Sequence, residues 1–247
     1  MADAAVWSSV AILALAGFAH GVFGFGFAMI ATPLLALFLD YRMAVLLAAV
    51  PVLLMAPSWL LAHRRQWSAC AIPASLLPAV AAGALCGVAL QIGLPQRVSL
   101  LLLAALLAIS VLTPWALSRW RVPAISSPTR AAAVFGGLAG ATESALNVGA
   151  PFMLIYGALA RFNRIEQLTA LNLCFALAKT IQVGLIYATG APPASPWALA
   201  FGTLASGACY YLGNRVANRF SEARFRRLLR YFLMIMVGAL VVRAALP

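Results

Sequence analysis

The chain has 247 residues, of which 64% are apolar and only 9% are charged, and its formal net charge is +12. A soluble domain carries about 25% charged residues, so this composition excludes a soluble enzyme, a disordered chain, a disulfide scaffold and a coiled coil. It predicts an all-α polytopic membrane protein. The basic residues stand in short gaps between apolar stretches, which is typical of cytoplasmic loop charge and predicts no nucleic-acid partner.

The predicted elements comprise two irregular apolar tracts and six regular spans of about 20 residues. The first tract, 4–39, is interrupted at Gly21–Gly26, and the second, 131–160, is interrupted at Thr142–Asn147. The flanks of each interruption reach about 11–18 residues, which is short for a full span. The regular spans are 43–62, 70–91, 98–118, 165–187, 196–214 and 228–246.

The two tracts resemble each other, which indicates a duplication. Gly17 and Gly21 precede the first interruption as Gly136 and Gly140 precede the second, and three regular spans follow each tract. We therefore expect a first repeat over 1–120 and a second over 121–247. Internal symmetry of this kind is typical of transporters.

Loop charge predicts that both tracts are re-entrant hairpins. If the tracts turn back, 13 arginines lie on one side of the membrane and three on the other, whereas crossing tracts divide them ten to six. The positive-inside rule favours the more uneven division. A hairpin plus three spans is an odd number of crossings, so the second repeat is inverted and both termini lie on the periplasmic side. The two tips then approach each other near the middle of the membrane and predict a central binding site, because an unwound backbone is tolerated there only inside protein or a wet cavity.

The two tips differ in polarity. Gly24 and Gly26 in the first tip allow bare backbone N–H groups to face a ligand. The second tip carries four polar side chains, and Glu143 is the one that ionises, so we expect it to couple a proton or sodium ion to transport or to gate the site. The other three can cap the following half-helix and line a substrate site; they are Thr142, Ser144 and Asn147.

Lys179 is the only lysine of the chain and lies near the centre of the span 165–187. Asn172 and Gln182 lie on the same helical face, so this polar stripe is expected to face the bundle. Lys179 either pairs with Glu143 as a structural link or attracts an anion to which Asn172 and Gln182 donate hydrogen bonds. The two roles are compatible, because a substrate can compete with Glu143 for the ammonium. His20, just before the first tip, is either structural or a proton relay.

Other kinds of site find no support in the sequence. We find no HExxH, Walker or GxSxG motif, and we predict no enzymatic activity, no cofactor and no metal site. The four cysteines lie inside apolar runs without a CxxC pair. Gly83 and Gly87 allow close helix packing, either within the chain or in a homo-oligomer.

The tracts GFAHGVFGFGFAMIATPLLAL and VFGGLAGATESALNVGAPFMLIYGAL, with the repeated layout, resemble the sulfite exporter TauE/SafE family of bacterial membrane proteins. The resemblance implies movement of sulfite, organosulfonates or other small organic anions across the inner membrane, with efflux as the direction. Residues 142–147 depart from the glycine-rich second tip expected of that family, which indicates a subgroup with its own substrate or coupling ion.

We therefore predict a secondary transporter of a small sulfur-containing anion, embedded in membrane lipid and working by alternating access around the two tips. Half-helix N-termini and a buried ammonium suit the three oxygens and single charge of a sulfonate. The alternatives are an anion channel or a carboxylate transporter of the same fold, or a non-transporting membrane subunit.

Overall fold

The computed structural model describes residues 2–119, 127–189 and 195–246, and within these ranges it is helical, with no strand. Helix makes up 86% of the structure, which confirms the predicted all-α class. The helices are α1 (Ala2–Phe23), α2 (Phe27–Ala36), α3 (Tyr41–Ala62), α4 (Arg64–Trp67), α5 (Leu76–Gly93), α6 (Gln96–Arg119), α7 (Pro128–Leu146), α8 (Ala150–Leu159), α9 (Arg164–Ala188), α10 (Pro196–Val216), the 3-10 helix η1 (Ala217–Arg219) and α11 (Glu222–Ala245). The sequence also predicts a short periplasmic loop over 189–196, most of which lies outside the described residues.

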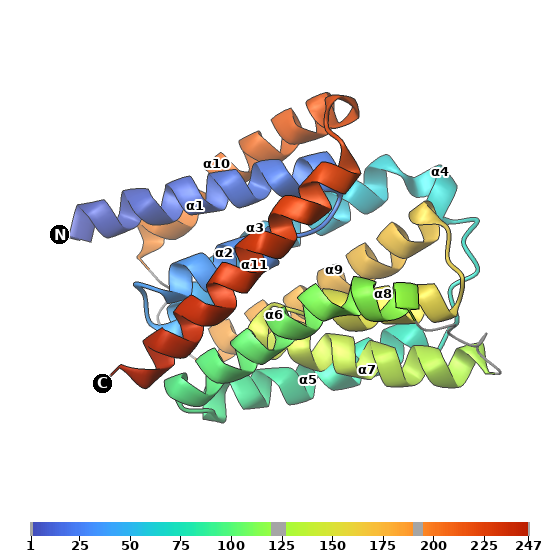
Figure 1. Cartoon of the computed structure of the whole chain (residues 1–247), viewed down its shortest axis with the longest axis horizontal. Helices are drawn as coiled ribbons and strands as arrows, with labels where there is room; N and C mark the ends of the chain where they lie inside the picture. Colours follow the sequence, from blue (N-terminus) through green and yellow to red (C-terminus); the bar gives the residue numbers. More distant parts are fainter. Residues whose placement is uncertain (1, 120–126, 190–194, 247) are drawn as a thin grey trace.

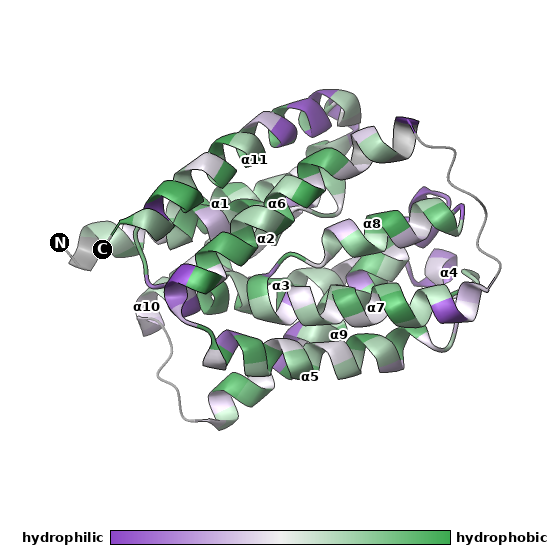
Figure 2. Ribbon diagram, turned by 60° about the horizontal axis from the view of Figure 1, so that its bottom comes forward, coloured by the Kyte–Doolittle hydropathy of each residue, from purple (hydrophilic) through white to green (hydrophobic). Residues whose placement is uncertain are grey.

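Among the described residues, six helices are long and apolar enough to cross a membrane. Six spans were predicted, but the two sets differ. The helix α1 qualifies over Ala4–Phe23, whereas α10 does not. The predicted span 70–91 begins later, at Leu76, because Pro73 favours an extended residue before it and the chain turns there. Apolar residues dominate the helices, and the hydrophilic ones gather at their ends (Figure 2).

Each irregular tract forms a hairpin with one long and one short arm. The long arms α1 and α7 have 22 and 19 residues, and the short arms α2 and α8 have 10 each. At 1.5 Å per residue, α1 is about 33 Å long and α2 about 15 Å. The expectation that every flank is too short to span was therefore wrong for α1, whereas α7 is not among the helices that are long and apolar enough to cross a membrane. Left-handed residues make the breaks: Gly24 and Gly26 in the first, Asn147 in the second.

The two hairpins open toward opposite ends of the molecule (Figure 1). The outer ends of α1 and α2 lie at the end that holds both chain termini, and those of α7 and α8 lie at the opposite end. The two tips overlap, and residues of both line one small cavity: Gly26 of the first tip, and Glu143 and Asn147 of the second. Tyr41, the first residue of α3, donates a hydrogen bond to Ala145 in the second tip (2.8 Å), while Gly24 of the first tip packs near Trp59 in the last turn of α3.

The long arms pack closely against α10 and α5, which occupy equivalent places in the predicted repeats. The arm α1 runs along α10, and α7 runs along α5. At both interfaces a glycine pair one turn apart lies directly against backbone of the neighbour: Gly17 and Gly21 against Ser206 and Tyr210, and Gly136 and Gly140 against Leu76 and Val80. A side chain on most of these glycines would overlap the facing backbone carbonyl. The inverted repeats of 1–120 and 121–247 stay a prediction.

Gly83 and Gly87 serve the same interface from the α5 side. They lie against the backbone of Gly137 and Ala141 of α7, so this small-residue face packs within the chain. The sequence left open whether this pair packs within the chain or in a homo-oligomer, and the structure shows it packed within the chain.

Candidate functional site

A small cavity lies where the two hairpins overlap. It is lined by the first residues of α2, Phe27 and Ala28, and by the first residue of α8, Ala150. Both short arms therefore turn their N-termini, which carry partial positive charge, toward one enclosed space. Its volume is about 10 Å³, the lower limit for a single water molecule. In this conformation the cavity has no room for an anion.

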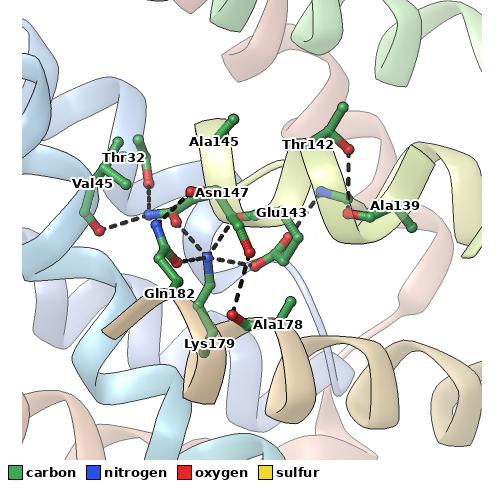
Figure 3. Close-up of polar contacts among 12 residues, drawn as sticks. Thr32, Val45, Ala139, Thr142, Glu143, Ala145, Asn147, Ala178, Lys179 and Gln182 are labelled. Atoms are coloured by element: carbon green, nitrogen blue, oxygen red, sulfur yellow. Dashed lines mark hydrogen bonds and ion pairs between the residues drawn. The ribbon is translucent and has the colours of Figure 1, made fainter. Parts of the chain in front are cut away.

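Lys179 is fully buried beside this cavity and points from α9 toward the last turn of α7 (Figure 3). Its Nζ lies 3.0 Å from Oε1 of Glu143 and donates hydrogen bonds to the backbone oxygen of Glu143 (2.6 Å) and to Oε1 of Gln182 (2.8 Å). It also donates to Oδ1 of Asn147. An ammonium has three N–H donors, so acceptors of the protein already engage all of them. The predicted pairing of Lys179 with Glu143 is present.

Glu143 also interacts with the start of α8, across the break in the second hairpin. Its second carboxylate oxygen, Oε2, accepts a hydrogen bond of 2.8 Å from the backbone N–H of Gly149, the N-cap residue of α8. A carboxylate at this position neutralises the positive end of the short helix. The capping role expected of Thr142, Ser144 and Asn147 was therefore wrong, because Glu143 performs it.

Asn147 joins the two hairpins across the centre of the protein. It ends α7 in the left-handed conformation, with a φ of 58°, and its Nδ2 donates to Oγ1 of Thr32 in α2 (3.0 Å) and to the carbonyl of Val45 in α3 (2.9 Å). Asn is one of the few residues other than Gly that adopt this conformation readily. One side chain thus connects α7, α2, α3 and Lys179.

Gln182 closes the polar cluster on the side of α5. Its Nε2 donates to the carbonyl of Ser144 (2.6 Å) and to Oε1 of Gln91 (2.9 Å), and the hydroxyl of Ser144 donates to the carbonyl of Ala178 (3.3 Å). The contacts of Gln91, Thr32 and Tyr41 were not predicted from the sequence. Gln91 could have been predicted, because it is the one residue with a side-chain amide in the predicted span 70–91.

The remaining predicted residues lie at the edge of this cluster or apart from it. His20 lines the cavity with Gly26, is 1% exposed, and has no hydrogen-bond partner for either ring nitrogen among the described residues. Thr142 bonds back to the carbonyl of Leu138 in its own helix (2.8 Å). Asn172 is buried on the expected face but bonds to its own helix, and its Oδ1 lacks a partner in the described structure. Gly24 faces the opposite side of the first tip.

The sequence of the chain matches a known family over nearly its whole length. The family model for the sulfite exporter TauE/SafE matches residues 9–240. The chain belongs to the TauE/SafE family of membrane transporters. Comparison with curated proteins and with solved structures gave no match.

Proposed function

We propose that this TauE/SafE protein is a secondary transporter of a small sulfur-containing anion, sulfite or an organosulfonate, and that it exports this anion across the bacterial inner membrane. One observation carries the proposal: the N-termini of both short helices, α2 and α8, line the same central cavity together with His20, Glu143 and Asn147. Broken helices that aim their positive ends at a midpoint are the usual anion sites of transporters.

Lys179 and Glu143 supply a mechanism for binding and coupling. While Glu143 is ionised, it holds the ammonium and caps α8, and the centre is closed. Protonation of Glu143 removes its negative charge, so that an anion can replace it at Lys179 and at the N-terminus of α8. Release of the proton restores the pair and expels the anion, so proton and anion cross together and the outward gradient of the anion drives export. His20 has no hydrogen-bond partner among the described residues and lines the same cavity, so it is placed to pass that proton.

The distribution of arginines between the two ends of the molecule indicates its orientation in the membrane. The end of the molecule that holds the starts of α9 and α11 carries Arg164, Arg226 and their arginine neighbours, and we assign it to the cytoplasm. Both termini then lie on the periplasmic side. The first hairpin enters from the periplasm and the second from the cytoplasm, so alternating access consists of small movements of each tip past the central cluster.

Two features weigh against the alternatives. A cavity of about 10 Å³ between occluding tips suits a carrier better than a channel, which keeps a continuous wet path when open. A non-transporting subunit has no need of a buried ammonium and carboxylate, which are costly within a membrane. A carboxylate transporter of the same fold uses the same donors and differs only in substrate.

The proposal is tested by uptake of radiolabelled sulfite, taurine, sulfoacetate and acetate into proteoliposomes. We expect saturable flux of sulfite or a sulfonate, lowered at least tenfold in Asn147→Gly, which keeps the left-handed turn but removes the amide. The matched control is Thr180→Val, next to Lys179 on the exposed face of α9, with wild-type flux expected. No flux of any sulfur anion from folded protein would overturn the proposal, and equal flux in Asn147→Gly would remove the cluster from the site.

A further inference from the structure

An apolar groove lies between α11 and the short arms of the two hairpins. The helix α11 packs along α6 and crosses α2 (Figure 1). A cavity of about 90 Å³ remains where these three helices meet α8. Its wall is mostly apolar and includes Phe25 of the first tip, Met29 of α2, Val111 of α6 and Leu154 of α8. The groove is therefore formed by four helices that are far apart in the sequence.

One face of α11 lines this groove. Leu229 and Leu233 are buried on that face, and Arg226 and Arg230 lie beside them at helical spacing. Arg226 already has an interaction within the protein. Arg230 is exposed and has no hydrogen-bond or ion-pair partner among the described residues. The described part of the wall contains no Asp or Glu either, so the charge of Arg230 is not compensated there.

Arg230 lies in a part of α11 that is long and apolar enough to cross a membrane. It belongs to the candidate span Ala223–Ala245, in which the start is hydrophilic and most of the rest is apolar (Figure 2). At 1.5 Å per residue, Arg230 stands about 12 Å from Glu222, the first residue of the helix. An arginine inside a span is paired, or its long side chain extends toward the lipid headgroups. Because the described residues supply no partner, a phospholipid phosphate is the acceptor that the membrane provides.

The groove and the arginine together match an anionic phospholipid. A guanidinium forms paired, charge-assisted hydrogen bonds with phosphate oxygens. An acyl chain buries apolar surface against Phe25, Met29 and Leu233, whereas inorganic phosphate gains nothing from these side chains. A headgroup with a net negative charge binds better than a zwitterionic one, because the exposed Arg219 and Arg224 add positive charge toward the start of the helix.

We propose that this groove binds one anionic phospholipid, with its headgroup phosphate at Arg230 and part of an acyl chain beside the first hairpin. The site does not depend on the proposed transport function. Met29 lines both the groove and the central cavity, so the bound chain packs against a residue of the central site. The lipid therefore stabilises the first hairpin from the side that faces α11.

The test is native mass spectrometry of purified, delipidated protein titrated with phosphatidylglycerol or phosphatidylcholine. We expect phosphatidylglycerol to bind about tenfold more tightly, and Arg230→Gln to weaken its binding by about tenfold, as the loss of a charge-assisted hydrogen bond predicts. Arg227→Gln is the matched control, since Arg227 is exposed on the same helix but does not line the groove, and its affinity should stay close to that of the wild type. Equal weakening in both variants, or equal affinity for the two lipids, would overturn the proposal.

Two further arms test the apolar part of the site and the identity of the occupant. Ser110→Leu places a larger apolar side chain in the groove and leaves Arg230 unchanged, so it should also weaken phosphatidylglycerol binding; unchanged affinity would refute the acyl-chain position. Inorganic phosphate or sulfite that displaces the lipid at a similar concentration would show that the groove takes a free oxyanion, and would refute a lipid site.

A thermal readout accompanies the binding measurement and needs no transport. Phosphatidylglycerol should raise the Tm of the wild type, followed by intrinsic fluorescence, and should raise that of Arg230→Gln much less. The Tm of each variant without lipid shows that it is folded. An equal rise in both proteins would show that the stabilisation does not come from this groove, and would count against the proposal.

Discussion

Removing Lys179 should destabilise the protein strongly, and removing Glu143 as well should restore part of the stability. Lys179→Met leaves the buried Glu143 carboxylate without its ammonium and leaves oxygens of Asn147 and Gln182 without their donor. Loss of one partner of a buried pair costs about 3–5 kcal/mol. In a chain of this size each kcal/mol shifts Tm by about 2–4 °C, so Tm should fall by about 6–20 °C.

The assay is thermal unfolding of purified protein in one detergent, monitored by intrinsic fluorescence. Glu143→Gln should lower Tm less than Lys179→Met does, because the ammonium keeps three neutral acceptors. The double variant should be more stable than Lys179→Met alone, since no unpaired carboxylate remains buried. Thr180→Val, on the exposed face, should stay close to the wild type. A double variant less stable than Lys179→Met would refute the reasoning, because it would show that the two residues do not depend on each other.

Three other predictions concern packing, coupling and topology. Gly140→Ala should lower Tm, since its new methyl group meets a backbone carbonyl of α5, whereas Gly184→Ala meets nothing within 4 Å and should leave Tm unchanged or slightly higher; equal effects would contradict the close packing. An imposed proton gradient, and not a sodium gradient, should drive sulfonate uptake, and Glu143→Gln should keep anion exchange but lose the response to the gradient. In a cysteine-free background, an impermeant maleimide added to intact cells should label Gln96→Cys and not Arg65→Cys; the opposite pattern would reverse the proposed orientation.

The membrane class, the two breaks and the polar face of α9 could be predicted from the sequence, because each depends on local chemistry. An apolar composition with few charges has no other stable arrangement than burial in lipid. Glycines and an asparagine mark positions where the backbone becomes left-handed, and the structure places such residues at both breaks, at Gly24, Gly26 and Asn147. Lys179 and Gln182 are buried together because a charged stripe on a spanning helix has to face protein.

Other properties depend on contacts between residues far apart in the chain, and only the tertiary structure decided them. Packing against α10 and α5 lets the long arms run past the middle of the bundle, which the lengths of the apolar flanks did not indicate. The acceptors that engage Lys179 come from two helices, and Glu143, not its polar neighbours, caps α8. The groove beside Arg230 exists because α11 packs along α6 and crosses α2. Spacing along a helix specifies which face a residue occupies, but not what that face meets.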